Sequence, residues 1–391
     1  MNNKKSFWQG ALCGALAILL VAGLVSCGLK NSSSKSGVIA ADTQKKISTL
    51  KKLIDENYLG EVEEEELEQG LYEGYISGLD DPYSMYYDEE ATKELNETTE
   101  GKYEGIGAVM TQDKNTGIIT LTHVYKDSPA MKAGLEDDDI LYKVESEEVT
   151  GEDLSEVVTR IRGDKGTKVE LTVLRGKENK EITVTAIRDK IEVETVEIKM
   201  LEDSIGYLAV SEFDSVTYEQ YKEGLEELEK EGMKALVVDL RGNPGGNLKT
   251  VCEMLDLMLP KGVIVSIKDK NGKEQKAESV EENQFTLPMT VLVNGYSASA
   301  SEIYAGAIQD YGLGKIVGTQ SYGKGVVQNI YDLKDGTCVK LTIAEYYTPN
   351  GRNINGKGIT PDVKVEYQYN EKDPEADNQL DKAVEELKKE M

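Results

Sequence analysis

The spacing of apolar residues changes along the chain and predicts several kinds of structure. Between residues 42 and 98, apolar side chains recur every three or four positions, as in Ile47, Leu50 and Ile54, and this period is typical of helices. A second helical run in this region ends before Pro82, because proline interrupts a helix. We therefore predict a helical N-terminal region over residues 42–98.

Residues 99–190 contain short apolar runs separated by glycine and aspartate. Such runs predict strands at 118–122, 169–174 and 182–184, and residues 154–161 between them predict a helix. We therefore expect a small β-rich domain in this part of the chain.

From residue 191 to 370 the pattern alternates between strands and helices, which predicts an α/β core. The expected strands are 205–210, 235–240, 263–267, 290–293 and 326–330. The expected helices are 218–229, a segment carrying Val251, Leu255, Met258 and Leu259, and 299–311. The last segment, 371–391, places Leu380, Val384 and Leu387 on one face and predicts an amphipathic helix for docking or dimerisation.

The β-rich region is similar to a PDZ domain. The similarity rests on Ser128-Pro129-Ala130, Ala133-Gly134-Leu135, Asp139-Ile140-Leu141 and Gly105-Ile106-Gly107-Ala108. The last of these motifs stands where PDZ domains carry their carboxylate-binding loop, so its four residues are the predicted peptide-binding site. Asp138 stands where glycine is usual, but aspartate tolerates a positive φ, so we expect the turn to form. A PDZ domain adds a peptide as an extra strand and binds its C-terminal carboxylate through backbone N–H groups.

The first 30 residues predict a targeting signal or a membrane anchor. Lysines precede an uncharged run from Ser6 to Leu29, in the order of a positive n-region and an apolar h-region. The run is also long enough to span a bilayer, which takes about 20 residues. It includes Leu24-Val25-Ser26-Cys27, which resembles the lipobox of bacterial lipoproteins, so the alternatives are a lipid on Cys27 and an uncleaved single-pass anchor. Both place the protein on the extracytoplasmic face of the membrane, and residues 31–41 predict a flexible tether.

The charge and the histidine content restrict the chemistry. Lys plus Arg is 45 against 72 for Asp plus Glu, which gives a net charge of -27. Such an acidic surface repels phosphate backbones, so we expect no nucleic-acid partner. The only histidine is His123, so a serine nucleophile would need a different base. No Cys or His cluster has the spacing of metal ligands, and we expect no metal and no other cofactor.

The cysteines add little chemistry. Cys13 lies in the apolar N-terminal run and Cys27 is the candidate lipid site. Cys252 and Cys338 could form a disulfide in an oxidising compartment, but we expect two separate buried thiols.

Ser299 stands where a predicted strand runs into a predicted helix. Ser299-Ala300-Ser301-Glu302 matches a capping box, so one alternative is a purely structural role. A serine at a helix N-terminus also lies where backbone N–H groups and the helix dipole stabilise an oxyanion. On that alternative the Ala300 N–H is one donor. The second comes from Gly245, in a glycine-rich turn that allows close approach.

Lys324 lies between two glycines. The residues from Gly318 onward fit the first seven positions of a phosphate-binding P-loop, but Gly325 stands where Ser or Thr is needed and a strand follows instead of a helix. We therefore do not expect nucleotide binding. A lysine whose pKa is lowered by burial could act as the base for Ser299. Gln328 lies four residues further on, on the same face of the predicted strand, and could orient the lysine.

Taken together, the ordered motifs make the chain resemble the carboxyl-terminal processing proteases, which are serine peptidases with a tethered PDZ domain. The motifs are Asp81-Pro82-Tyr83-Ser84, the Gly105 region, 239–246, 297–310, 322–328, 347–352 and 358–362. The resemblance implies that Ser299, the middle serine of its motif, is the nucleophile, that Lys324 is the base and that Gln328 completes the site. It also implies oxyanion donors at Gly245 and Ala300, a crotonase-like core, a PDZ domain that recognises substrate C-termini, and terminal helices that often form homodimers.

We therefore expect a multidomain α/β protein: a crotonase-like protease core, an inserted β-rich PDZ domain, and helical N- and C-terminal elements. Its expected activity is that of an extracytoplasmic serine endopeptidase that cleaves proteins or peptides with exposed C-termini through an acyl-enzyme. One alternative is a catalytically silent PDZ adaptor, which a broken Ser, Lys or Gln position would indicate, and none is broken. The other is acyl-CoA chemistry on a crotonase-like core, against which the PDZ segment and the Ser–Lys pair argue.

Overall fold

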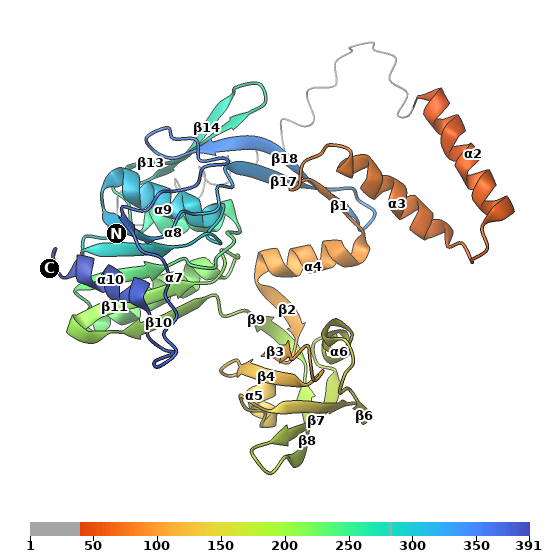
Figure 1. Cartoon of the computed structure of the whole chain (residues 1–391), viewed down its shortest axis with the longest axis horizontal. Coiled ribbons are helices and arrows are strands. Elements are labelled where there is room, and N and C mark those ends of the chain that lie inside the picture. Colours follow the sequence, from red (N-terminus) through yellow and green to blue (C-terminus); the bar gives the residue numbers. More distant parts are fainter. Residues whose placement is uncertain (1–39, 281–283) are drawn as a thin grey trace, which may run out of the picture. The chain divides into compact units, whose positions relative to one another are not determined.

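The computed structural model describes residues 40–280 and 284–391 (Figure 1). The predicted signal or anchor segment with Cys13 and Cys27, and nearly all of the predicted tether, lie outside these residues. In the described part of the chain, no helix combines the length and the apolar character needed to cross a membrane. The chain divides into two compact units, one ending at Glu68 and the other covering Gln69–Met391.

The first unit contains helix α2 (Ala41–Asn57) and the beginning of helix α3 (Glu64–Ser77), where the apolar spacing predicted helices. Neither helix buries a residue. The Lys51 amine pairs with Asp55 at 2.5 Å and with Glu64 at 2.6 Å. Such exposed ion pairs contribute little stability. Because neither helix buries a side chain, packing within the unit does not explain these helices either.

Two elements follow α3: strand β1 (Met85–Tyr87) and helix α4 (Glu89–Glu100). Asp88 caps α4 by accepting the Ala91 N–H at 2.8 Å. Strand β1 was not predicted. It pairs antiparallel with β18 (Cys338–Tyr347), and local spacing carries no information about so distant a partner.

The β-rich region forms a six-stranded sheet, as the short apolar runs predicted. Its strands are β3 (Ala108–Gln112), β4 (Ile119–Val124), β5 (Ile140–Val144), β7 (Lys168–Arg175) and β8 (Lys180–Ile187), with β6 (Glu147–Glu148) beside β5. Its helices are α5 (Pro129–Ala133) and α6 (Leu154–Ile161), and β2 (Lys102–Gly105) pairs separately with β9 (Asp189–Glu192). Asp138 has a φ of +67°, so aspartate adopts the turn expected of it.

The α/β core is built on a six-stranded sheet that is parallel apart from its first pair. Its strands in order are β10 (Val196–Met200), β11 (Ile205–Val210), β12 (Ala235–Asp239), β15 (Met289–Val293), β16 (Gly314–Gly318) and β19 (Val363–Lys364), and a 3₁₀ turn, η1 (Glu202–Ser204), precedes β11. Leu236 and Val238 of β12 enter one apolar cluster, and Ala235 and Val237 enter another. Burial on both faces explains the unbroken apolar sequence of this strand.

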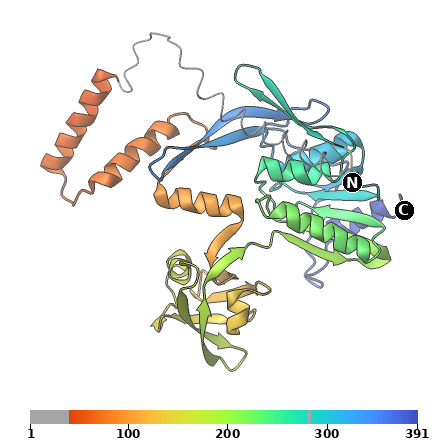
Figure 2. The same ribbon diagram turned by 180° about the vertical axis from the view of Figure 1, so that it is seen from behind.

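Helices cover both faces of this sheet. One face carries α7 (Thr217–Lys230), α8 (Leu248–Asp256) and α9 (Ala300–Tyr311). Figure 2 shows α7 and α8 side by side. Helix α8 ends before Met258 and Leu259, which we expected inside it, although both are buried. On the other face, α10 (Asn378–Leu387) packs Ala383 and Leu387 against the sheet, so this helix docks on its own core, and a dimer contact stays a prediction.

A second sheet carries the lysine motif. Its strands are β1, β18, β13 (Gly262–Asp269) and β14 (Glu274–Ser279), with β17 (Val326–Asp332) paired to β18. Ile264, Val265 and Tyr346 of this sheet join the apolar cluster under α8 and α9. The helical elements, the β-rich domain and the α/β core together confirm the predicted multidomain α/β class.

Candidate active site

The three serines of the Ser-Ala-Ser-Ala-Ser segment lie in different surroundings. The Ser297 hydroxyl donates to the Leu240 carbonyl at 2.7 Å, and the Ser301 hydroxyl donates to the Asn243 carbonyl at 3.0 Å. Both of these serines are fully buried. Ser299 is only partly buried, at the first turn of α9. Of the three serines, only Ser299 is therefore open to solvent, whereas the other two hydroxyls hold neighbouring turns.

The backbone of Ser299 is unusual, with φ of +54° and ψ of -112°. Residues other than glycine rarely adopt a positive φ, and a strained backbone of this kind costs about 1–3 kcal/mol unless surrounding contacts fix it. One such contact is the bond from the Ser299 N–H to the Glu302 carboxylate at 2.9 Å, the acidic half of the predicted capping box.

The buried Glu302 carboxylate joins the two predicted catalytic segments. One oxygen accepts the N–H groups of Ser299 and Lys324 at 2.9 and 2.8 Å. The other accepts the Ser321 hydroxyl and the Gly323 N–H at 2.5 and 2.7 Å. Burial raises the pKa of Glu302 despite these hydrogen bonds. Glu302 is therefore more than a helix cap, because it fixes the start of α9 against the lysine turn.

A second bridge between these segments comes from Tyr346 on β18. Its hydroxyl lies 3.0 Å from the Ser299 carbonyl and 2.6 Å from the Lys324 carbonyl, and can donate to either. Burial raises the pKa of Tyr346 well above its usual range, so the phenol keeps its proton. Sequence reasoning missed this residue, and no local signal marks it, since its partners lie in other elements.

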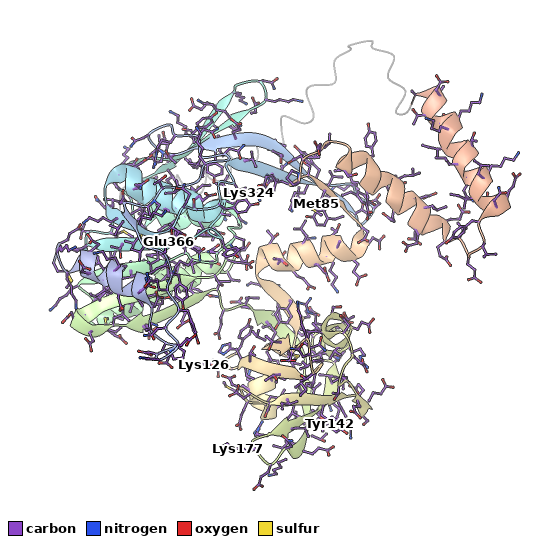
Figure 3. The ribbon with its side chains drawn as sticks, in the orientation of Figure 1. Met85, Lys126, Tyr142, Lys177, Lys324 and Glu366 are labelled. Carbon is purple, nitrogen blue, oxygen red and sulfur yellow. The ribbon has the colours of Figure 1, made fainter. Side chains whose placement is uncertain are left out.

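Lys324 lies in the turn before β17, where Figure 3 labels it. Its amine nitrogen lies 4.7 Å from the centroid of the Tyr83 ring. Burial lowers the pKa of Lys324 and the positive charge of Lys340 lowers it further, whereas Asp81 and Glu302 act in the opposite direction. The pKa of Lys324 is lowered overall, and this suits a base, because the amine must be neutral to accept a proton.

The structure does not place Gln328 as predicted. Its amide donates to the Thr342 hydroxyl at 3.2 Å. Lys324 precedes the strand, which begins at Val326, and a β-bulge lies directly before Gln328, so the same-face rule for strand residues does not apply. Within the described residues, the Lys324 amine makes no hydrogen bond to Gln328 or to Ser299.

The predicted oxyanion turn lies against Ser299. Gly245 has a φ of +108°, and a methyl group on its Cα would lie 2.7 Å from Ser299 Cβ and 3.0 Å from the Ala300 nitrogen. This close approach requires glycine. The Gly245 N–H donates to the side-chain oxygen of buried Asn243 at 2.8 Å, which the sequence did not predict. It must exchange this acceptor for the substrate oxygen to serve as an oxyanion donor.

The predicted peptide-binding loop borders a hollow of about 180 Å³ in the β-rich domain. The hollow is lined by Tyr103, Ile106, Ala108, Met110, Val158, Ile161 and Arg162. Gly105 ends β2, and Gly107 has a φ of +77°, which turns the chain into β3. The lining combines apolar side chains with the guanidinium group of Arg162, which pairs with Glu97 at 2.9 Å and lies over the Tyr103 ring.

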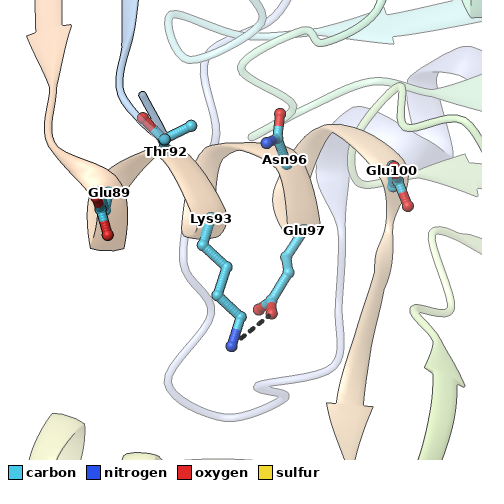
Figure 4. A pocket seen from close by; sticks show the side chains of 7 residues that line it. Glu89, Thr92, Lys93, Asn96, Glu97 and Glu100 are labelled. Carbon is cyan, nitrogen blue, oxygen red and sulfur yellow. Dashed lines mark ion pairs between the residues drawn. The ribbon is translucent and has the colours of Figure 1, made fainter. Parts of the chain in front are cut away.

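A second hollow, of about 270 Å³, lies on α4 (Figure 4). It is lined by Glu89, Thr92, Lys93, Asn96, Glu97, Glu100 and Gly336. Lys93 and Glu97 form an ion pair at 4.0 Å. No predicted catalytic or peptide-binding residue lines this hollow, so it is separate from the candidate site.

Cys252 and Cys338 are both free, as expected. Burial raises the pKa of Cys252 to about 12, so its thiol is not a nucleophile at neutral pH. Among residues 40–280 and 284–391, no group of His, Cys, Asp and Glu side chains is arranged to hold a metal ion.

Three family models match successive parts of the chain. The activating protease CtpB N-terminal domain matches residues 25–91, the PDZ domain matches 120–175, and peptidase family S41 matches 204–365. With the fold described above, they define a serine peptidase with a PDZ domain.

The similarity to individual proteins is also extensive. The chain is 35% identical over 355 residues to a probable CtpA-like serine protease of Staphylococcus saprophyticus, covering 90% of this chain and 71% of that protein. It is 37% identical over 324 residues to the carboxy-terminal processing protease CtpB of Bacillus subtilis, covering 82% and 67%. A crystal structure of a Bacteroides fragilis protein assigned to the S41 proteases shares the fold, with a TM-score of 0.52 at 14% identity, over 86% of this chain and 92% of that one. The chain therefore belongs to the carboxy-terminal processing proteases of peptidase family S41.

Proposed function

We propose that this C-terminal processing serine protease cleaves through Ser299, Lys324 and Gln328. The neutral Lys324 amine takes the Ser299 proton as the serine oxygen attacks the scissile carbonyl carbon. The N–H groups of Gly245 and Ala300 stabilise the oxyanion. Lys324 then returns the proton to the leaving amine, which departs and leaves an acyl-enzyme ester. Water, deprotonated by the same lysine, hydrolyses that ester.

The observation that carries this proposal is the double bridge between the two segments. Glu302 binds the N–H groups of both Ser299 and Lys324, and the Tyr346 hydroxyl contacts both of their carbonyls. The carboxylate and the phenol hold the start of α9 and the lysine turn side by side, as a serine nucleophile and a lysine base require.

The cleaving arrangement differs from the structure at three contacts. The Lys324 amine must leave the Tyr83 ring, the Gly245 N–H must leave Asn243, and the Gln328 amide must leave Thr342 if it is to orient the lysine. We propose that these three contacts change when a substrate C-terminus binds in the hollow beside Ile106 and Ala108. Binding there presents the rest of the substrate chain for cleavage.

Labelling with a serine-reactive fluorophosphonate tests the catalytic proposal. Ser299→Ala should abolish both labelling and cleavage of a partly unfolded protein, whereas Ser301→Ala, which removes a buried neighbouring hydroxyl, should keep the label. Lys324→Ala should reduce cleavage by about 10²–10⁴-fold, the usual effect of losing a general base. Unchanged cleavage by pure Ser299→Ala protein would contradict the proposal. Peptide binding without any cleavage by the wild type would instead support the PDZ adaptor.

We also propose that the protein acts on the extracytoplasmic face of a bacterial membrane, held there by its first 30 residues. The support is the uncharged run from Ser6 to Leu29, which ends beside the lipobox-like Cys27. Metabolic labelling with a lipid precursor decides between the alternatives. Labelling that disappears in Cys27→Ser indicates a lipoprotein, and membrane retention without a lipid indicates a single-pass anchor. A wild-type chain found in the cytoplasm would contradict both.

A further inference from the structure

The segment Asp81 to Ser84 approaches the candidate site from outside the α/β core. We propose that Tyr83 is a positioning residue for Lys324: its ring retains the charged amine, and the lysine becomes a base only after the amine leaves that ring. This inference rests on the proposed role of Lys324.

The geometry of the contact is that of a cation over an aromatic face. The Lys324 nitrogen lies 4.7 Å from the centroid of the Tyr83 ring, within the range of about 6 Å in which the ring attracts a cation. Burial raises the pKa of Tyr83, and the neighbouring side chain of Tyr322, two residues before Lys324, acts in the same direction. Tyr83 thus lies beside two residues of the lysine turn, Tyr322 and Lys324.

The backbone around Tyr83 is held in place by its own network. The Tyr83 N–H donates to the Asp81 carboxylate at 3.2 Å, and the Ser84 hydroxyl donates to the same carboxylate at 2.5 Å. The Ser84 oxygen in turn accepts the Thr342 N–H of β18 at 3.0 Å. The residues that follow form β1, which pairs with β18. These contacts fix the backbone of Tyr83 and so keep its ring beside the Lys324 amine.

The charges around the amine come from the segment of Tyr83 itself and from two other elements. Asp81 precedes β1, Glu302 lies in α9, and Lys340 lies in β18. The two carboxylates favour the ammonium and Lys340 disfavours it. The ring of Tyr83 attracts the ammonium and not the neutral amine, so it acts in the same direction as the carboxylates. Its removal should make Lys324 easier to deprotonate.

The test is the pH dependence of kcat/KM in three variants of the full chain. Tyr83→Leu removes the aromatic face and should move the acidic limb of the profile to lower pH by about 0.4–1.5 units. Tyr83→Phe keeps the ring and should leave the limb within about 0.2 units of the wild type. Tyr142→Leu is the matched control, because the Lys143 nitrogen also lies 4.7 Å from the Tyr142 centroid, in the β-rich domain, and it should not move the limb.

An acidic limb of Tyr83→Leu that coincides with that of Tyr83→Phe overturns the inference. If Tyr83→Leu does not fold, Tyr83→Trp decides, since tryptophan binds cations more strongly and should move the limb to higher pH. An unmoved limb in that variant also overturns it. The fluorophosphonate labelling rate of Ser299 against pH is a second readout. Cleavage at the wild-type rate by Ser299→Ala or Lys324→Ala would refute the proposed function itself, so the two failures are distinguishable.

Discussion

Glu302 accepts hydrogen bonds from Ser299, Ser321, Gly323 and Lys324, and its side chain is fully buried. Glu302→Gln replaces one acceptor oxygen with an NH₂ group, so two of these donors lose their partner and face another donor. We expect kcat to fall at least about tenfold, and the free energy of unfolding to fall by about 1–3 kcal/mol. Peptide cleavage and denaturant unfolding measure the two effects.

The control for this substitution is Glu345→Gln, because Glu345 is exposed on β18 beside the buried Tyr346. It should change neither the activity nor the stability appreciably. A Glu302→Gln enzyme with full kcat would mean that the carboxylate only caps α9, as the capping-box alternative holds.

Single residues differ in how far the sequence could predict them. Ser299 and Gly245 carry local signals, a strand-to-helix junction and a glycine-rich turn, and the structure brings them together. Lys324 was expected as the base because the sequence has one histidine and holds this lysine between two glycines, and the family resemblance selected Ser299 among the three serines. Tyr346 and Asn243 carry no such signal, because each acquires its role from a partner in another part of the fold or from the conformation of a turn.

At the scale of elements, the turn after β12, which contains Gly245, has no room for a side chain at that position. Gly245→Ala would place a methyl group 2.7 Å from Ser299 Cβ and 2.8 Å from the Ala298 carbonyl oxygen, on a backbone with φ of +108°. The turn must shift, and we expect cleavage to fall by about 10²–10³-fold, the effect of losing one oxyanion donor.

Gly242→Ala separates steric crowding from backbone strain in the same turn. Gly242 also has a positive φ, +76°, but a methyl group there would meet no atom within 4 Å. This variant should lose stability by about 1 kcal/mol and keep most of its activity. Equal activity losses in the two variants would show that strain alone, and not contact with Ser299, makes glycine necessary at position 245.

The C-terminal helix α10 is attached to the core through its N-cap, Asp377. Asp377 caps α10 by accepting the N–H groups of Gln379 and Leu380, each at 3.0 Å, and its carboxylate binds the Arg241 guanidinium at 2.6 Å. These hydrogen bonds lower the pKa of Asp377 against the effect of its burial. Asp377→Ala should destabilise the protein by about 1–3 kcal/mol, through the lost cap and the loss of one of the two carboxylates that pair with Arg241, the other being Asp239.

The loss in Asp377→Ala should be smallest in acid. A lowered folded-state pKa means that the carboxylate stabilises the fold above its unfolded pKa of about 3.9, and that this stability is lost as the pH falls through the folded value. Thermal unfolding at pH 3 and pH 7 measures the difference. Asp377→Asn, which keeps a capping side chain, should retain part of the stability. A loss that is equal at the two pH values would exclude the charge of Asp377 as its cause.

Elements with local partners or continuous burial were predicted well, and those with distant partners were not. Helix α6 covers residues Leu154–Ile161, as its spacing indicated, and β12 was recognised from its apolar run. Strand β1 was missed because only pairing with β18 makes it a strand. The bulge before Gln328 was invisible for the same reason, since register belongs to a pair of strands and not to one sequence.

At the scale of the whole molecule, one loop of the core contacts both the end of α4 and the oxyanion turn. The Ser215 N–H donates to the Thr99 carbonyl at 3.1 Å, and the Phe213 N–H donates to the Gly245 carbonyl at 3.0 Å. Between them lies Asp214, which is buried. A single short loop, residues 213–215, thus connects the end of α4, which leads into the PDZ domain, with the turn beside Ser299. The ionisable group in this loop is Asp214.

Asp214 should make the stability of the whole chain depend on pH. Burial raises the pKa of Asp214 to about 7, and the neighbouring charge of Glu212 contributes. Its unfolded pKa is about 3.9, so the native state binds more protons than the unfolded state between about pH 4 and pH 7. Stability through this group therefore falls as the pH rises across that window, by up to about 4 kcal/mol. Asp214→Asn removes the ionisation, so it should stabilise the protein at pH 8 and have little effect at pH 4.

Denaturant unfolding of wild type and Asp214→Asn at pH 4, 6 and 8 measures this effect. Glu212→Gln is the control for the electrostatic part, since removing that charge should lower the pKa of Asp214 and give a smaller stabilisation in the same direction. An Asp214→Asn protein that is destabilised equally at all three pH values would show that the side chain acts as a hydrogen-bonding group. In that case ionisation of this loop would not weaken its contacts with α4 and Gly245. The predicted result would instead identify a protonated carboxyl group beside the oxyanion turn whose ionisation loosens the fold as the pH rises.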